Sequence, residues 1–401
     1  MFRRRSPEVA VNGERLLVGL DLNATRVRAV TGEAGVPQPL TLDGPDGELA
    51  MALSLEDRQP VVGRAGVALC RRLPHLTCSD FLAHLGQTKQ WTAGRHRLDA
   101  AGALSLVFQR LHSATSTAQG FLAAISAYLG LEQLETLAAS AEKSRLPLLG
   151  TVPAPIAAAA SVSLQKPGTA VALVLDVDDH AMTWAAVRPR ESSAEQVALV
   201  LSHVVTLRPL GLRAWKQRLL NTIAERCIRH SRRDPRECAD AEQALYDQLD
   251  VAMTKCRRGE LAEIDIQAPQ WYQNFYLRAN ELESYCAALV RPAIDAMYET
   301  LMAAQIEDPP AAVIVTSPAA RLPGLFAALQ DRIAEPTQVI TLPADAVARA
   351  AHDVATRITA GRLPRGHLQT LPISPIDQST ARTSANRREP SIPARLTGTD
   401  R

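Results

Sequence analysis

The sequence predicts an α/β protein with two duplicated lobes, each a mixed sheet flanked by helices, on either side of a central cleft. Three observations predict this fold class. A strand that ends in an aspartate, a short turn and a returning strand occur at residues 15–30 and again at residues 170–187. After each hairpin, strand-like runs alternate with segments of helical periodicity. The chain has 401 residues, which is enough for two lobes.

The composition is that of a globular protein, with 46% hydrophobic and 21% charged residues. A formal net charge of +2 gives no reason to expect a nucleic-acid partner. The six cysteines form no CxxC pair and no zinc-like cluster, which predicts reduced thiols in a cytoplasmic protein. No apolar run approaches the roughly 20 residues that span a bilayer, and no apolar segment typical of a signal peptide follows the basic start.

Residues 15–30, RLLVGLDLNATRVRAV, predict the first hairpin. An apolar run leads to Asp21, and Asn23 predicts a tight turn because asparagine tolerates the left-handed region. The following residues alternate, which predicts a half-buried strand with Arg26 and Arg28 on the side opposite the apolar residues.

The rest of the first lobe follows in chain order. Apolar spacing and turn residues predict strands at 48–55, 59–64, 121–125 and 145–150, and helices at 65–72, 98–111, 130–144 and 155–160. The last of these helices is rich in alanine, so it can lie very close to a neighbouring backbone.

The second lobe opens with the strands 170–176 and 182–187, joined by a turn at 177–180. Further strands are predicted at 261–266, 312–315 and 339–340, and helices at 211–229, 240–256, 277–307, 322–333 and 344–358. We expect a disordered leader at 1–14, lobes at about 15–165 and 166–362, and a disordered tail rich in Pro, Ser, Thr and Arg at 363–401.

Six stretches, in this order, resemble the nucleotide-binding domain of the seventy-kilodalton heat-shock chaperones of the DnaK type. They are LLVGLDLNAT (16–25), the segment 126–160, VALVLDVDDHAMTWAAV (171–187), RPLGLRAWKQRLL (208–220), ELESYCAALVRPAIDAM (281–297) and VIVTSPAARLPGL (313–325). The resemblance implies an actin-like ATPase fold, in which two hairpin turns cradle the phosphates of ATP or ADP and aspartates face Mg²⁺. The positions that it assigns to a remnant nucleotide cleft are Asp21, Asn23, Ala24, Thr25, Asp176, Asp178 and Lys255.

The chain departs from the family where the chemistry is done. Asp178, Asp179 and His180 replace three glycines of the second turn, and glycine is what lets backbone N–H groups approach a phosphate. Two like charges about 4 Å apart cost roughly 4 kcal/mol at an effective dielectric near 20. The family's lysine falls near Val67, its glutamate at Ala154, and its adenosine glycines at 317–318, where this chain has Ser-Pro.

These losses predict a degenerate, non-hydrolysing DnaK-like protein, with no catalytic residues and no bound cofactor, that works by binding another protein. One alternative is a divergent ATPase that still binds ATP or ADP with Mg²⁺, and a second is a scaffold or filament protein of the actin superfamily. Asp176, Asp178 and Asp179 could together hold a divalent cation or form a solvated turn. The aromatic run 270–276 is equally consistent with a partner surface and with core packing.

Overall fold

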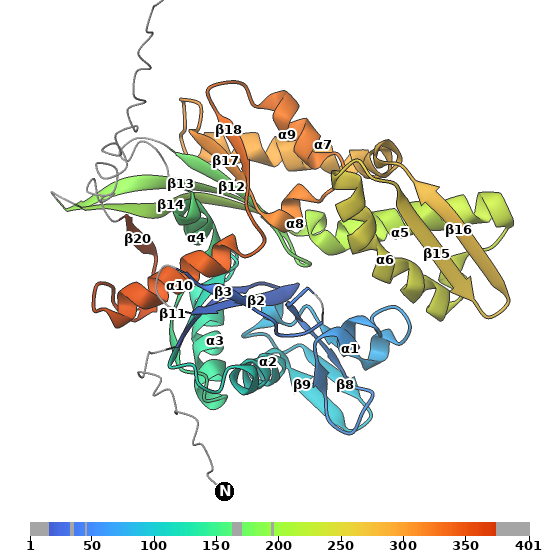
Figure 1. Cartoon of the computed structure of the whole chain (residues 1–401), viewed down its shortest axis with the longest axis horizontal. Helices are drawn as coiled ribbons and strands as arrows, with labels where there is room; N and C mark the ends of the chain where they lie inside the picture. Colours follow the sequence, from blue (N-terminus) through green and yellow to red (C-terminus); the bar gives the residue numbers. More distant parts are fainter. Residues whose placement is uncertain (1–15, 33–35, 45, 163–170, 194–195, 374–401) are drawn as a thin grey trace, which may run out of the picture.

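The fold consists of two mixed sheets flanked by helices, which confirms the predicted α/β class with two lobes (Figure 1). A computed structural model describes residues 16–32, 36–44, 46–162, 171–193 and 196–373. The described residues up to 153, blue to teal in Figure 1, lie on one side, and those from 171 to 341, green to orange, lie on the other.

The two sheets share one strand plan. The first sheet has the order β19-β11-β10-β1-β2-β3, with β4 paired to β2, and the second has the order β18-β17-β12-β13-β14-β20. In each, an antiparallel hairpin and a third antiparallel strand are followed by two strands parallel to the first. The first sheet contains β1 (Leu17–Leu22), β2 (Arg26–Gly32), β3 (Gln38–Leu40), β4 (Leu49–Ala50), β10 (Gly120–Ile125), β11 (Leu148–Pro153) and β19 (Gly366–His367). The second contains β12 (Ala172–Val177), β13 (Met182–Ser193), β14 (Gln196–Leu207), β17 (Ala312–Val315), β18 (Gln338–Thr341) and β20 (Thr370–Ile373).

The central strands are apolar because helices cover both of their faces. Every residue of β1 and of β10 is buried, as expected for parallel neighbours in an α/β sheet. On one face lie α2 (Ala100–Ala114) and α3 (Leu131–Lys143). The Asp99 side chain caps α2 by accepting a hydrogen bond of 2.7 Å from the backbone N–H of Gly102.

Two alanine-rich helices lie between the sheets and pack against each other: α4 (Ala154–Ser161) and α10 (Ala346–Thr359). Each crosses to the opposite sheet, because α4 contacts β12 and β14 whereas α10 contacts β1 and β10. At Gly19 a Cβ atom would lie 2.2 Å from the carbonyl oxygen of Ala348, so only glycine lets α10 approach β1 this closely. The small-residue helix predicted at 155–160 is α4, which is buried from Ala154 to Ala159 and packs against α10.

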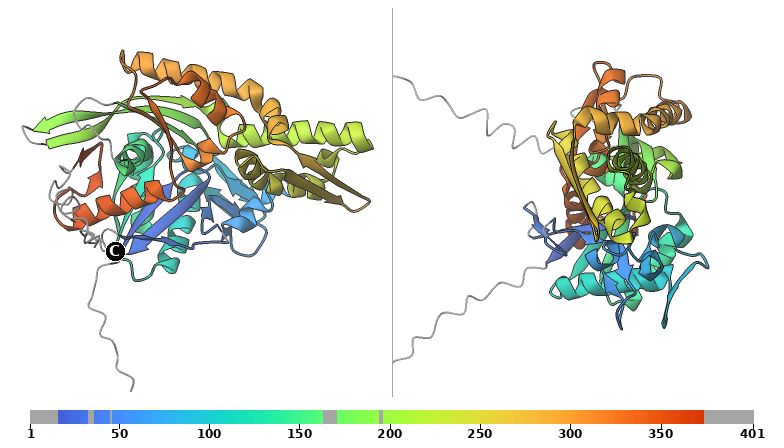
Figure 2. Two further views of the ribbon diagram at one scale, coloured as in Figure 1. Left: turned by 45° about the horizontal axis from the view of Figure 1, so that its top comes forward. Right: turned by 90° about the vertical axis from the view of Figure 1, so that its right-hand side faces the viewer.

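Each lobe carries an outer part inserted after its third strand (Figure 2). In the first lobe it comprises β5 (Ala52–Ser54), β6 (Val61–Val62), α1 (Arg64–Val67), η1 (Pro74–Leu76), β7 (Thr77–Ser79), η2 (Leu82–His84), β8 (Gln90–Ala93) and β9 (His96–Asp99). In the second it comprises η3 (Arg208–Leu210), α5 (Leu212–Ser231), η4 (Pro235–Glu237), α6 (Ala239–Arg257), β15 (Ala262–Ala268) and β16 (Trp271–Leu277). Then follow α7 (Ala279–Ala303), α8 (Ser317–Ala320) and α9 (Leu325–Arg332).

The predicted tail was placed too early. Residues 363–373 are part of the fold, since β19 pairs with β11 of the first sheet and β20 with β14 of the second. Leu363, Leu368 and Leu371 are buried in the core between the sheets, and the two strand edges that pair with the segment lie far from it in sequence. The predicted leader and the tail beyond residue 373 lie outside the described residues.

Candidate functional site: the junction of the two hairpin turns

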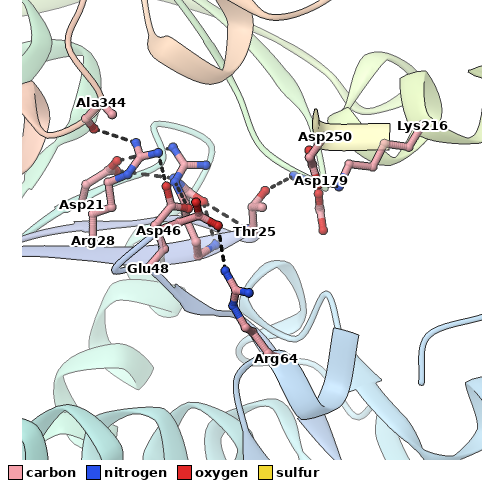
Figure 3. A network of polar contacts seen from close by, with 12 residues as sticks. Asp21, Thr25, Arg28, Asp46, Glu48, Arg64, Asp179, Lys216, Asp250 and Ala344 are labelled. Atoms are coloured by element: carbon pink, nitrogen blue, oxygen red, sulfur yellow. Dashed lines mark hydrogen bonds and ion pairs between the residues drawn. The ribbon is translucent and has the colours of Figure 1, made fainter. Parts of the chain in front are cut away.

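The two hairpin turns contact each other directly through a reciprocal pair of hydrogen bonds. The backbone N–H of Ala24 donates to Oδ2 of Asp178 at 3.1 Å, and the backbone N–H of Asp179 donates to Oγ1 of Thr25 at 2.8 Å. Figure 3 shows the second of these contacts at the centre of a wider polar network. The structure thus brings Ala24, Thr25 and Asp178 together as the sequence predicted, but it brings them together as partners of one another.

The Asp178 carboxylate accepts five hydrogen bonds and is only 2% exposed. Oδ1 accepts from the backbone N–H groups of His180 and Ala181, both at 3.0 Å. Besides Ala24, the donors to Oδ2 are the hydroxyl groups of Ser126 at 3.0 Å and Tyr128 at 2.6 Å.

Backbone amides and hydroxyls that converge in this way are donors that proteins use to hold a phosphate. Burial raises the pKa of Asp178, and the hydrogen bonds from Tyr128, Ala181 and Ala24 oppose that rise. The expectation of a solvated second turn is therefore wrong at Asp178, because its side chain points into the junction and supplies an anion there.

The first turn is formed without glycine because Asn23 closes it with its side chain. Its Oδ1 accepts hydrogen bonds from the backbone N–H groups of Thr25 at 3.0 Å and Arg26 at 3.1 Å, an arrangement in which asparagine mimics a backbone turn. None of the residues in the two turns has a positive φ. The backbone N–H of Ala24 is left to bond Asp178.

Arg26 is the site residue that sequence reasoning missed. The alternating pattern predicts Arg26 on the side of the strand opposite the apolar residues, but Arg26 is only 3% exposed. Its guanidinium lies 3.8 Å from Oδ2 of Asp21 and 3.1 Å from Oε2 of Glu48. Burial disfavours the charged form, and the carboxylates of Glu48, Asp21, Asp176 and Asp178 outweigh that cost and raise the pKa of Arg26.

Asp21 and Asp176 each lie one residue before the end of the first strand of their hairpin and face the region that Arg26 fills. Burial raises the pKa of both, and the charge of Asp21 raises that of Asp176 further. Oδ1 of Asp176 accepts a hydrogen bond of 2.7 Å from the hydroxyl of Thr316. A guanidinium thus stands among the carboxylates that the resemblance assigns to Mg²⁺. Within the ranges that the structure describes, no group of three His, Cys, Asp or Glu side chains could hold a metal ion.

The buried lysine near the junction is Lys216, which is not among the residues that the resemblance assigns to the nucleotide cleft. Lys216 is 6% exposed, pairs with Asp250, and lies close enough to Asp179 for their charges to interact (Figure 3). None of the side-chain hydrogen bonds or ion pairs between described residues involves Lys255, which lies near the end of α6. The apolar periodicity of α5 contained the missed signal, because Lys216 lies one turn from Leu212 and Leu220 on the buried face.

The carboxylate of Asp179, which lies near Lys216, is buried without a complete set of hydrogen-bond partners in the described part of the chain. Its Oδ1 is buried and has no hydrogen-bond partner among the described residues. Burial raises its pKa, against the opposing charges of Lys216 and Arg213.

The outer parts of the two lobes are bonded to each other through Gln243 of α6. Its Oε1 accepts from the backbone N–H groups of Arg71 at 2.7 Å and Arg72 at 3.2 Å, and its Nε2 donates to the carbonyl of Val67 at 3.0 Å. The Arg71 guanidinium also stacks on the ring of Tyr246, 4.7 Å from its centroid. The backbone where the family places its lysine is thus bonded to the opposite lobe.

A second bridge between the lobes involves His180, the last of the three positions at which the resemblance expects glycine. Its Nδ1 lies 3.3 Å from Oδ1 of Asp80, and its ring packs against that of Tyr128. Arg213 approaches Asp80 from α5 at 3.7 Å. Burial would raise the pKa of Asp80, but His180 and Arg213 outweigh it and lower the pKa.

The comparisons with known proteins add no name to this geometry. No model of a known protein family matches the chain, and no curated protein matches its sequence. Among the described residues, no helix has the length and apolar character needed to cross a bilayer.

Proposed function

We propose that this chain is a DnaK-like protein of the actin-like fold that neither binds nor hydrolyses nucleotide. It works instead by binding another protein. One observation carries the proposal. The Asp178 carboxylate accepts N–H groups from both hairpin turns, at the place where the resemblance puts the phosphates. An anion that belongs to the chain competes there with any anion from solution.

The negative charge of the junction also supports a loss of nucleotide binding. A phosphate entering the junction would approach Asp176, Asp178 and Asp179, and each like-charge contact at about 4 Å costs roughly 4 kcal/mol at an effective dielectric near 20. The guanidinium of Arg26 already neutralises the carboxylates of Asp21 and Glu48. Lys216 is likewise already paired with Asp250, so neither cation is left to stabilise the charge that phosphoryl transfer develops.

The strand plan supports the actin-like assignment. Both sheets repeat one order of three antiparallel and two parallel strands, and the last helix of each half crosses to the other sheet. The two hairpin turns meet where the two halves face each other, and this is the junction at which we place the degenerate site.

The test is whether nucleotide stabilises the protein. A ligand at 100 times its Kd raises the free energy of unfolding by about 2.7 kcal/mol. We expect Mg·ATP and Mg·ADP at millimolar concentration to leave Tm unchanged and to show no heat of binding by calorimetry. A saturable rise in Tm, or phosphate release above the blank, would overturn the proposal in favour of the divergent ATPase.

A further inference from the structure

The outer face of the β15–β16 hairpin carries an ordered pair of exposed tyrosines. Figures 1 and 2 show this hairpin at one end of the longest axis of the molecule. Its inner face is apolar and buried, and β15 contacts α6. The buried side chains are Ala262, Ile264, Ile266, Phe275 and Leu277. The aromatic run 270–276 is thus divided, with Phe275 in the core and Tyr272 and Tyr276 outside.

Two carboxylates hold the tyrosines in place. The register sets Glu263 opposite Tyr276 and Asp265 opposite Asn274. The hydroxyl of Tyr272 donates to Oδ1 of Asp265 at 2.7 Å, and that of Tyr276 donates to Oε1 of Glu263 at 3.1 Å. The amide of Asn274 donates to both carboxylates and links the two pairs. We call these five residues the tyrosine–carboxylate face.

The tyrosine–carboxylate face is ordered but uncovered. Tyr272 is 63% exposed and Tyr276 is 53% exposed. Hydrogen bonds that fix an exposed aromatic ring in advance reduce the entropy that a partner must remove on binding. Tyrosines of this kind are enriched among the residues that dominate protein interfaces.

The charged side chains of the tyrosine–carboxylate face are all negative. Neither β15 nor β16 contains a lysine or an arginine. Hydrogen bonds from Tyr272 and Asn274 lower the pKa of Asp265, so its carboxylate is ionised at neutral pH. This face therefore presents aromatic rings beside fixed negative charge, which repels nucleic acid and anionic lipid.

We propose that the tyrosine–carboxylate face binds an arginine-rich segment of a partner protein. A guanidinium is planar, stacks on an aromatic ring and can bond a carboxylate through two N–H groups at once. The two tyrosines are four residues apart on one strand, about 13 Å, so an extended partner with arginines at the same spacing would contact both. The inference rests on the proposed protein-binding function and names the surface that performs it.

The experiment uses the full chain and a fluorescent hexa-arginine peptide, with anisotropy read at low and moderate salt. Hexa-arginine should bind, hexaglutamate should not, and the affinity should fall as salt rises. The variant Y272A/Y276A should weaken binding at least about tenfold. The variant E263Q/D265N should weaken it similarly and flatten its salt dependence.

Tyr298 provides a matched control, since it is 41% exposed but lies on α7, outside this face. Y298A should bind hexa-arginine as the unaltered chain does, and circular dichroism checks that each variant is folded. Equal binding of the two peptides, or binding that survives both double variants, would overturn the inference. Nucleotide binding at the junction would overturn the pseudoenzyme reading while leaving these outcomes unchanged, so the two failures are distinguishable.

Discussion

The hydroxyl of Tyr128 donates a hydrogen bond of 2.6 Å to Oδ2 of Asp178 and so ties a loop of the first lobe to the second hairpin turn. Ser126 and Ala24, also of the first lobe, donate to the same oxygen. One carboxylate of the second lobe is therefore the acceptor for three donors of the first lobe. The contact between the two hairpin turns thus depends on a side chain of the protein itself.

Asp178→Asn tests how much this acceptor contributes. The substitution keeps the shape but turns one acceptor into a donor, so buried N–H and O–H groups lose their partner. We expect a loss of about 2–4 kcal/mol in the free energy of unfolding, measured with denaturant. Asp353→Asn is the control: its side chain is 69% exposed, and the change should stay within about 0.5 kcal/mol. Equal effects of the two variants would contradict the role of Asp178.

Asp178→Gly should leave a vacant anion site that phosphate can fill. The N–H groups of Ala24, His180 and Ala181 would then lack their acceptor, as would the hydroxyl of Tyr128. We expect inorganic phosphate to raise the Tm of this variant by more than it raises that of the unaltered chain, at matched ionic strength with chloride. Tyr128→Phe keeps the carboxylate and should gain nothing from phosphate. The same small rise in all three proteins would count against an internal phosphate mimic.

Arg26→Met should be costly because it removes the cation that neutralises Asp21 and Glu48. Leaving buried charges without their partner costs about 3–5 kcal/mol, and chemical denaturation measures the loss. Arg64→Met breaks a pair in which Arg64 is 48% and Asp46 is 74% exposed, so it should cost less than about 1 kcal/mol. If both variants were equally stable, Arg26 would not be the central cation of the junction.

Gln243→Ala should loosen the outer contact between the lobes. It removes the partner of the backbone N–H groups of Arg71 and Arg72, so amide hydrogen exchange in residues 64–73 should accelerate. Gln248→Ala is a matched control on the same helix, because Gln248 bonds only residues of its own lobe. Faster exchange of 64–73 in both variants would indicate general destabilisation instead of an opened contact.

Asp179→Asn should change the pH dependence of stability in a defined direction. Burial raises the pKa of Asp179 above its ordinary 3.8, so the native state binds this proton more tightly than the unfolded chain. The unaltered chain therefore loses stability as the pH rises from 3.8 through the raised pKa that Asp179 has in the native state. The variant should be relatively more stable at pH 7.5, with an advantage that shrinks as the pH falls toward 3.8.

Asp234→Asn is the control of opposite sign. The hydrogen bonds from Arg236 lower the pKa of Asp234, so its ionised form stabilises the native state above pH 3.8. That variant should be less stable at pH 7.5, and the deficit should disappear as the pH falls. Parallel stability curves for Asp179→Asn and the unaltered chain would contradict a raised pKa at Asp179.

The sequence was informative where a pattern is local and repeated. The apolar run up to Asp21 and its counterpart up to Asp176 predicted both hairpins, because burial on both faces demands unbroken hydrophobic strands. The alanines of 155–160 predicted a helix in close packing. The residues at 178–180 predicted a second turn with side chains in place of bare backbone, and the Asp178 side chain does bond the backbone of both turns.

The sequence was misleading where a contact between residues far apart in the chain decides whether a side chain is buried or a segment is ordered. Arg26 alternates with apolar residues like a solvent-facing side chain, and only the carboxylates of Asp21 and Glu48 explain its burial. Residues 366–373 have the composition of a tail, but two strand edges order them. Lys216 lies on the apolar face of α5, and only its contact with Asp250 explains why a lysine is buried there.

By itself, then, the sequence determined a duplicated α/β architecture and a second turn crowded with carboxylates, since periodicity and residue type act over a few neighbours. Only the tertiary structure decided what those carboxylates do. Asp178 finds its donors at positions 24, 126 and 128, and the free energy of a buried charge depends on which groups the fold places around it.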